Sequence, residues 1–282
     1  MLALLVATFF SSAFGLVLRD AMGRRCNPWA VGVMNYVTAT AIQLARHAAT
    51  GDPWRIESLT LLLGSAVGVL YALNFSLFVP LLSRRGVSIP AAMSRLAVIL
   101  PMLASLLIWG ERLTGIQGAG ALLSLAALPL LTLTRGEHTT GGKLDVRTAG
   151  LLLALLTGNG LSMVLTKAYE RSGLNQQALF LASLFGTAIL VSGIAWWRQR
   201  QGTSPRDVVP GMALGLTNAL ANWGLVAALV TIPAVLVFPF YSAAGLVITA
   251  ILARMLFGER ISRLEATGIA TAVAAVTLAN LG

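Results

Sequence analysis

Apolar runs of about 20 residues recur along the whole chain, and they limit the possible fold more than any other feature of the sequence. A run of that length, coiled as an α-helix, spans the roughly 30 Å of hydrocarbon in a bilayer. Charged residues make up 11% of the chain, whereas a soluble domain carries about 25%. A soluble core has no use for this much apolar sequence, but helices that face lipid do. The sequence therefore predicts an all-α membrane protein.

Hydropathy and the signals for helix ends divide the chain into ten predicted transmembrane helices. Prolines directly after Asn27 and Ile232 mark two helix starts, because proline fits the first turn of a helix. The apolar run at the N-terminus lacks the preceding basic residues of a signal peptide, so we interpret it as the first helix. The predicted helices span residues 2–18, 28–47, 58–82, 89–109, 113–134, 148–168, 174–197, 208–230, 234–257 and 262–281.

The two halves of the chain come into register when the sequence is shifted by 148 residues. Apolar matches between membrane helices mean little because few residue types are used, but polar residues that match at one ungapped offset indicate a duplication. The matching segments and pairs are Gly110-Glu111-Arg112 with Gly258-Glu259-Arg260, Asn27 with Asn175, Asn74 with Asn222, and Ser94 with Ser242. We therefore predict a first five-helix repeat at 1–134, a connecting loop at 135–147 and a second five-helix repeat at 148–282.

An odd number of helices in each repeat means that the second repeat enters the bilayer from the opposite side. Fourteen of the 20 Lys and Arg residues fall in the loops after the first, third, fifth, seventh and ninth helices, and five fall in the other loops. Because basic loops tend to stay in the cytoplasm, this bias places both termini outside. Two inverted repeats can exchange inward-open and outward-open conformations around a site near the midplane, which is alternating access.

The doubled Gly-Glu-Arg, followed by small-residue runs such as residues 115–131, resembles the drug/metabolite transporter superfamily and, within it, the ten-helix EamA-like type. The resemblance covers essentially the whole chain. It implies a secondary transporter or exporter of small metabolites. Family members often carry an arginine within the second and seventh helices, where this chain has Asn35 and Ser183. The resemblance also implies a central cavity lined mainly by the helices at 2–18, 58–82, 89–109, 148–168, 208–230 and 234–257.

Family members are commonly drawn with cytoplasmic termini, in disagreement with the charge bias of this chain, which we follow. None of the ten acidic residues falls within a predicted apolar core. The small cation-exporting relatives rely on a buried glutamate that exchanges protons for a cation, and that residue has no equivalent here. The sequence therefore favours a neutral, zwitterionic or anionic substrate. The same absence argues against a hydrolase, so we expect no enzymatic activity.

Composition also excludes several classes of site. The single cysteine, Cys26, cannot form a disulfide within the chain or a multi-cysteine metal centre. His47 and His138 both lie between apolar runs, and we expect no metal and no cofactor. The net charge of +10 is spread singly between apolar runs, a pattern of membrane topology rather than of nucleic-acid binding.

Arg95 is the only basic residue well inside a predicted helix. Its guanidinium either binds a carboxylate or phosphate of the substrate or reaches back towards the nearby loop. Asn74 and Asn222 lie in the middle of repeat-related helices, with Tyr71 and Asn218 on the same helix faces. An unpaired amide is costly against lipid, so these faces must look inward, where they either bind substrate or hold helices together.

Four further polar residues are candidates for the same site, although ordinary helix packing explains them equally well. They are Ser94, Ser242, Tyr241 and Asn159. Phe238 shares a helix face with Tyr241, and the two could wall a cavity. Glu111 and Glu259 lie at the N-terminal ends of the helices at 113–134 and 262–281, where the helix dipole favours a carboxylate. We interpret both as structural helix-end residues.

The leading hypothesis is a secondary transporter that works as an exporter of an amino acid or similar organic acid. Two alternatives remain open at this stage: a flippase for an amphipathic lipid, and a non-transporting membrane subunit that stabilises a partner. The expected partners are a zwitterionic or anionic small molecule and the lipid bilayer, with the protein a monomer or weak dimer. The expected location is the plasma (inner) membrane of a bacterium.

Overall fold

The computed structural model describes residues 1–85, 93–133, 146–199, 202, 204–257 and 263–281. All regular secondary structure in these ranges is helical, and ten of the helices have nine residues or more. They are α1 (Leu2–Gly23), α2 (Pro28–Thr50), α3 (Ser58–Arg85), α5 (Ile99–Leu107), α6 (Gly115–Leu133), α7 (Val146–Arg171), α8 (Gln177–Gln199), α9 (Pro205–Thr231), α10 (Ala234–Phe257) and α11 (Arg263–Leu281).

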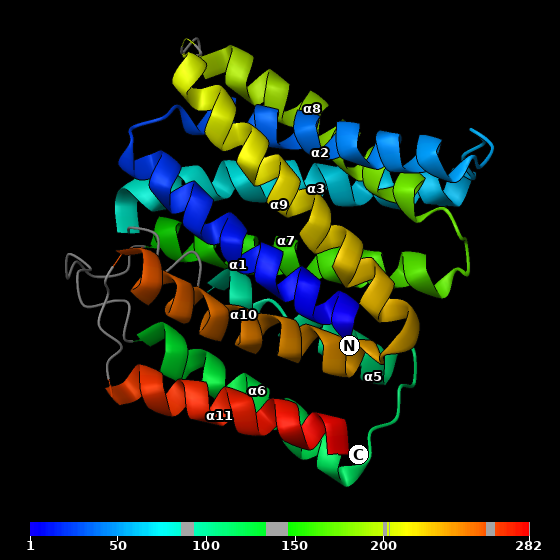
Figure 1. Ribbon diagram of the computed structural model, residues 1–282, viewed down its shortest axis with the longest axis vertical. Helices are drawn as coiled ribbons and strands as arrows, with labels where there is room; N and C mark the ends of the chain where they lie inside the picture. Colours follow the sequence, from blue (N-terminus) through cyan, green and yellow to red (C-terminus); the bar gives the residue numbers. More distant parts are fainter. Residues whose placement is uncertain (86–92, 134–145, 200–201, 203, 258–262, 282) are drawn as a thin grey trace.

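The helices lie across one another in a bundle, and both chain termini are at the same end of it (Figure 1). The connections from α2 to α3, from α7 to α8 and from α9 to α10 are at this end too, which we call the terminal end. Within the described ranges, six helices are long and apolar enough to cross a membrane: α1, α3, α7, α8, α9 and α10. Three shorter apolar helical segments span Met93–Leu107, Gly115–Ala127 and Ala266–Ala275.

The packing of the helices repeats between the two halves of the chain. At the offset of 148 residues, α1, α2, α3 and α6 correspond to α7, α8, α9 and α11. Accordingly, α1 and α2 both pack on α9, and α7 and α8 both pack on α3, while α2 pairs with α8 and α6 pairs with α11. The α6 and α11 helices lie side by side and run in opposite directions (Figure 1). Each repeat therefore packs largely on the other, which places their shared surface at the centre of the bundle.

The predicted continuous helix at 89–109 is interrupted, and this expectation needs correction. In its described part, residues 93–96 form one helical turn, Ala97 and Val98 form a turn, and α5 follows. The reason is Pro101, which has no N–H to donate to the carbonyl of Ala97. That carbonyl instead accepts from Leu100 N at 3.1 Å. Ser94 and Arg95 lie on the helical turn before this break.

The start of α9 lies three residues before the predicted helix at 208–230. Ser204 and Asp207 form a capping box, in which each side chain accepts a hydrogen bond from a backbone N–H at the helix start. Asp207 is 2% exposed and also accepts from the backbone N–H of Asn27 at 2.9 Å. The carboxylate therefore joins the start of α9 to the start of α2. The Ser-x-x-Asp spacing was the sequence signal for this start.

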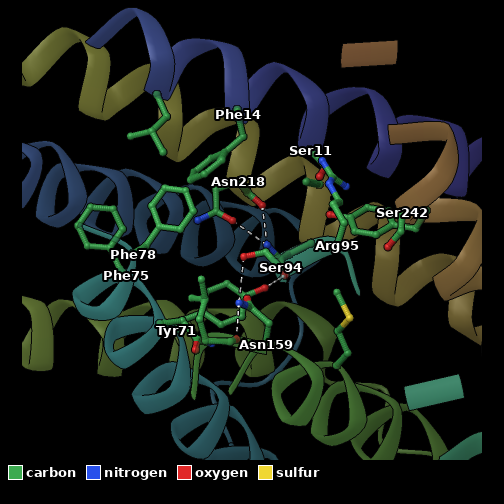
Figure 2. Close-up of a pocket in the computed structure, with 18 of the residues that line it drawn as sticks. Ser11, Phe14, Tyr71, Phe75, Phe78, Ser94, Arg95, Asn159, Asn218 and Ser242 are labelled. Atoms are coloured by element: carbon green, nitrogen blue, oxygen red, sulfur yellow. Dashed lines mark hydrogen bonds between the residues drawn. The ribbon is translucent and has the colours of Figure 1, made fainter. Parts of the chain in front are cut away.

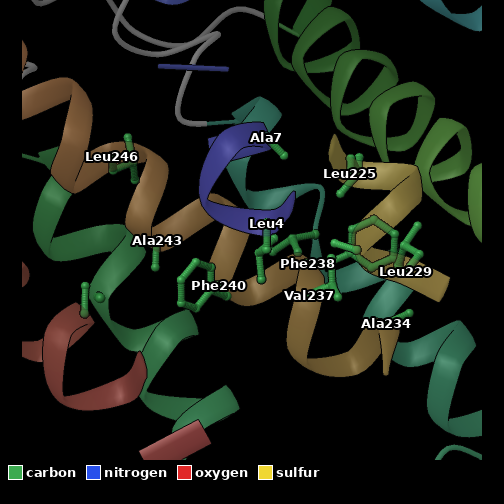
Figure 3. Packing of buried hydrophobic residues seen from close by; sticks show 14 residues of the cluster. Leu4, Ala7, Leu225, Leu229, Ala234, Val237, Phe238, Phe240, Ala243 and Leu246 are labelled. Atoms are coloured by element: carbon green, nitrogen blue, oxygen red, sulfur yellow. The ribbon is translucent and has the colours of Figure 1, made fainter. Parts of the chain in front are cut away.

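A cluster of buried apolar side chains joins α1, α9 and α10 towards the terminal end of the bundle (Figure 3). Leu4 of α1 packs with Leu225 and Leu229 of α9 and with Phe238 of α10, and none of the four is more than 5% exposed. Phe238 therefore belongs to the core and does not wall a cavity, contrary to the expectation from its position beside Tyr241. Its ring is enclosed because α1 and α9 cross over the beginning of α10.

Two small-residue motifs let equivalent helix pairs approach closely. Gly64 and Gly68 of α3 face the backbone of α8, and Gly211 and Gly215 of α9 face α2. Both pairs have the Gly-x-x-x-Gly spacing, which brings two glycines onto one helix face and lets membrane helices pack backbone to backbone. A Cβ atom added at Gly215 would lie 2.5 Å from the carbonyl oxygen of Asn35. The neighbouring backbone would have to move to make room.

We expect the substitution Gly215→Ala to lower the free energy of unfolding by about 1–3 kcal/mol, because the added methyl overpacks a contact with backbone atoms. The matched control is Gly186→Ala in α8, where a Cβ would meet no atom within 4 Å. The control should leave stability unchanged or raise it by up to about 1 kcal/mol, since alanine favours helix over glycine. Unfolding midpoints of both variants in one detergent test the difference. Equal midpoints would contradict the close contact between α2 and α9.

Candidate functional site

A cavity of about 300 Å³ lies between the two repeats, and it is lined from six helices and from the turn at 93–96 (Figure 2). All nine residues that the sequence nominated for substrate binding line it. These are Tyr71 and Asn74 of α3, Ser94 and Arg95 of the 93–96 turn, Asn159 of α7, Asn218 and Asn222 of α9, and Tyr241 and Ser242 of α10. The tertiary structure thus brings together side chains from positions 71 to 242.

The elements around the cavity correspond to the six helices that the family resemblance implied, with one addition from α2. The added residue is Tyr36. Sequence reasoning also missed Ser11 and the aromatic residues Phe14, Phe75 and Phe78, all of which line the cavity. Ser11 had a usable signal, because the offset of 148 residues relates it to Asn159. The phenylalanines had none, since a phenylalanine in a membrane helix is unremarkable by itself.

A chain of hydrogen bonds crosses one side of the cavity. Tyr71 Oη donates to Asn222 Oδ1 at 2.7 Å, and Asn222 Nδ2 donates to Asn218 Oδ1 at 2.8 Å. Asn218 Nδ2 in turn donates to Asn35 Oδ1 at 3.1 Å. The chain connects α3, α9 and α2, so Asn218 and Asn222 hold helices together while they also line the cavity. Asn35, which stands where family members often have arginine, is part of this connection.

Asn74 differs from Asn222, its equivalent in the other repeat. Its Oδ1 packs directly against Gly158 of α7, at a place where any Cβ would overlap it. Its Nδ2 is buried and has no hydrogen-bond partner among the described residues, and the same holds for the Ser242 hydroxyl. A buried donor without a partner is costly and calls for an explanation. Both residues line the cavity, so we regard their unused hydrogen bonds as candidates for contacts with a bound molecule.

Arg95 lies at the cavity, partly buried, on the turn that precedes the break at Ala97. Its guanidinium rests over Gly245 of α10, where a Cβ would come within 2.8 Å of Nη1. A larger residue at Gly245 would therefore push the guanidinium away. The offset of 148 residues pairs Arg95 with Ala243, a fully buried apolar residue. The positive charge is thus supplied by one repeat only, which makes the cavity electrostatically asymmetric.

Ser94 and Asn159 meet across the cavity between the 93–96 turn and α7. Asn159 Nδ2 donates to Ser94 Oγ at 3.3 Å and to the carbonyl oxygen of Leu155 at 2.8 Å. The neighbouring polar residues of α7, Ser162 and Thr166, bond the carbonyls one turn before them and stay within the helix. Of these three polar residues of α7, Asn159 is the one that lines the cavity.

Glu111 lies four residues before α6, and its side chain contacts the other repeat. Its carboxylate accepts a hydrogen bond from the N–H of Val235, in the first turn of α10, at 3.0 Å. It also pairs with Lys167 of α7 at 3.3 Å, and Lys167 pairs with Glu170 at 2.6 Å. Glu111 is thus a helix-end residue for α10, where the helix dipole favours a carboxylate. Glu259, its repeat equivalent, lies outside the described residues.

Within the described ranges, no three His, Cys, Asp or Glu side chains come together as a possible metal site. The chemistry available at the cavity is therefore one positive charge, several amides and hydroxyls, and an aromatic surface. Such groups can bind and orient a small molecule.

Two repeats pack on each other around a central cavity, within helices apolar enough to cross a bilayer, and this arrangement suits a membrane transporter. The sequence model of the EamA-like transporter family matches residues 1–133 and again residues 148–281. The chain belongs to this family, and it is a multi-pass membrane transporter of the drug/metabolite type that acts on a small molecule in a lipid bilayer. Family members are transporters and generally not enzymes.

The fold has a counterpart among solved structures. One crystal structure superposes with a TM-score of 0.81 over 99% of this chain and 96% of the other chain, at 19% sequence identity. At that identity, the likeness establishes the shared fold alone. A comparison with curated proteins gave no match.

Proposed function

We propose that this protein is a secondary transporter that exports a small zwitterionic or anionic metabolite, such as an amino acid or an organic acid. The observation that carries the proposal is the composition of the central cavity. It combines the single guanidinium of Arg95 with several amides and hydroxyls, and it lies between the two repeats. A cavity of about 300 Å³ suits a ligand of amino-acid size, at the lower end of small-molecule pockets.

The distribution of side chains in the cavity further restricts the chemical class of the proposed substrate. Phe14, Phe75 and Phe78 gather on one side, whereas Arg95 and Ser242 lie on the other (Figure 2). An acid group fits beside the guanidinium, because a carboxylate or phosphate forms two parallel hydrogen bonds with it. An apolar body fits against the phenylalanines. The proposed substrate is therefore a small organic acid with an apolar portion.

Alternating access is the proposed mechanism, with ten membrane-crossing helices arranged as inverted repeats at 1–134 and 148–282 joined by the loop at 135–147. The opposite directions of α6 and α11 and the repeated packing of α1 on α9 and of α7 on α3 support an inverted arrangement. Two similar halves can exchange conformations at nearly equal energy, which exposes the cavity first to one side and then to the other. Arg95 would hold the acid group, while Asn74 and Asn222 orient the polar body.

Counterflow in proteoliposomes tests the proposal. Vesicles preloaded with one unlabelled candidate, an amino acid or another organic acid, should accumulate the labelled form of the same compound, because an exchanging carrier returns label against the preloaded pool. Candidates are chosen by a thermal-shift screen, since a ligand that binds only the folded state raises its stability. Movement of a labelled phospholipid between leaflets instead of organic acids would indicate a flippase. If neither the organic acids nor the phospholipid moves, the proposal is contradicted, and a non-transporting scaffold role is the alternative that remains.

We expect both termini to face away from the cytoplasm, in the inner membrane of a bacterium, because the loops at the end opposite the termini carry most of the Lys and Arg. A fluorescent protein that matures only in the cytoplasm should give no signal when fused to Gly282. The same protein fused after Arg198, at the other end of the bundle, should be bright. Bright fluorescence from the Gly282 fusion and none from the Arg198 fusion would show that the termini face the cytoplasm, contrary to our prediction.

A further inference from the structure

A second cavity, of about 350 Å³, lies at the terminal end of the bundle, between the α2–α3 and α7–α8 connections. It shares no lining residue with the central cavity. Only five Lys and Arg residues fall in the loops that the sequence assigns to this end, and two of them, Arg46 and Arg55, line this one cavity. His47, one of two histidines in the chain, lines it as well.

Arg46 is held in place by its neighbours. Its guanidinium carbon lies 5.2 Å from the centroid of the Trp223 ring, and Nη1 donates to Gln43 Oε1 at 2.6 Å. A guanidinium carries five N–H donors in a planar fork, and this hydrogen bond uses one of them. A stacked, partly bonded guanidinium loses little freedom when it binds an oxyanion with its remaining donors. The Arg46 guanidinium is therefore preorganised to bind an anionic group.

His47 supplies a second and independent indication. It is 4% exposed, and its Nε2 is buried without a hydrogen-bond partner among the described residues. Buried polar atoms in proteins are normally bonded, so a residue of the cavity lining with an unbonded nitrogen has a hydrogen bond left to offer to a ligand. The Trp54 ring packs against the imidazole in a T-shaped arrangement, with 4.6 Å between the ring centroids.

The remaining wall of the cavity also favours negative charge. The first residues of α8, Gln177, Ala178 and Leu179, contribute to the lining, and backbone N–H groups at a helix start attract anions. Asp52 is the one acidic residue in the lining, so two guanidinium charges face one carboxylate. The offset of 148 residues relates Arg46 and His47 to Ile194 and Ala195. The cationic group is therefore absent from the other repeat and is not a by-product of the duplication.

We propose that this second cavity binds a phosphate group, either free in solution or in the headgroup of an anionic phospholipid. Trp54 is 63% exposed beside it, and tryptophan is enriched where a membrane protein meets the headgroup layer. Basic pockets between membrane helices bind anionic headgroups through the same combination of charge and hydrogen-bond donors. This inference does not depend on the substrate of the central cavity.

The unfolding midpoint of the full chain in an uncharged detergent tests the proposal. The probes are short-chain phosphatidylglycerol, phosphatidylcholine of equal chain length, inorganic phosphate, and potassium chloride at matched ionic strength. Phosphatidylglycerol should raise the midpoint saturably, as expected for a ligand that binds only the folded protein. A rise with phosphatidylglycerol alone identifies a lipid headgroup, and an equal rise with inorganic phosphate identifies a soluble phosphate. A rise no larger than that with phosphatidylcholine or chloride would overturn the proposal.

Substitutions locate the effect in this cavity. Arg46→Gln should weaken the apparent affinity for the effective probe about tenfold or more, by removing charge-assisted hydrogen bonds. Arg55→Gln, at an exposed position where folding is not at stake, should weaken it severalfold. Asp52→Asn should strengthen it, because a repelling carboxylate is removed. Arg198→Gln, an exposed arginine near the opposite end of α8, is the control and should change nothing. Affinities that are the same in Arg55→Gln, Asp52→Asn and the control would overturn the assignment.

Discussion

The substitution Arg95→Ala is expected to lower the affinity of the transporter for its organic acid ten- to a hundredfold. The reason is the loss of a charge-assisted hydrogen bond, which typically costs about 1.5–3 kcal/mol. Arg95→Lys should weaken binding less, because lysine keeps the positive charge and loses only the planar two-pronged geometry. The measurement is the concentration dependence of counterflow with the acid that the proteoliposome screen identifies. Binding by thermal shift provides the check that does not depend on transport rate.

Two further variants separate a substrate-binding arginine from one that only anchors the helix at the membrane surface. Arg95→Leu should express normally and lose transport if the guanidinium binds substrate. Gly245→Ala keeps the charge but displaces the guanidinium, whose Nη1 would lie 2.8 Å from the new methyl carbon. Because the end of an arginine side chain moves easily, this variant should fold as well as the wild type. It should nevertheless bind the substrate more weakly than the wild type does. If Arg95→Leu carries substrate at the wild-type rate, the case for an anionic substrate fails.

The substitution Lys167→Met is expected to destabilise the protein by about 3–5 kcal/mol, the largest stability effect that we anticipate. Lys167 is 3% exposed and pairs with both Glu111 and Glu170, whose side chains are 11% and 15% exposed. Methionine fills a similar volume but leaves two largely buried carboxylates without their cation. The free energy of unfolding in detergent measures the loss. Arg24→Met, which breaks an exposed pair with Asp20, should cost less than about 1 kcal/mol.

The origin of the Lys167 effect can be tested by restoring neutrality. Adding Glu111→Gln and Glu170→Gln to Lys167→Met removes the unpaired charges, and we expect much of the lost stability to return. A glutamine at 111 can still accept the hydrogen bond from Val235 N, so the start of α10 stays capped. If Lys167→Met is no more destabilising than Arg24→Met, the buried ion pairs of Lys167 with Glu111 and Glu170 do not stabilise the fold as we expect.

Much of the architecture could be predicted because membrane helices and gene duplication both leave patterns that are local or periodic in sequence. Helix length and apolar character follow from the thickness of the bilayer. The prediction of one continuous helix at 89–109 was wrong, and the reason is local too. Pro101 has no backbone N–H to donate, and the chain turns at Ala97 and Val98. The start of α9 was missed although its Ser204 and Asp207 capping box was visible in the sequence.

The candidate site was predictable only in its polar members. Polar residues are rare enough in apolar helices for Arg95, Asn74 and Asn222 to stand out, because burying such groups in lipid is costly. All three line the central cavity, while their role in binding remains a prediction. Phe14 and Phe78 carried no comparable signal, because an aromatic residue in a membrane helix is equally at home against lipid, in the core or at a cavity.

The sequence by itself determined an all-helical chain of two related halves, with acidic residues excluded from the apolar runs, because these properties depend on composition and on spacing along the chain. The tertiary structure alone decided which side chains share a space. It placed Glu111 at the start of α10 rather than on the helix that follows it, and it enclosed Phe238 in the core. It also gathered Arg46, His47 and Arg55 with the start of α8 in a second cavity. Such contacts join residues that are distant in the chain, and they depend on how whole helices cross.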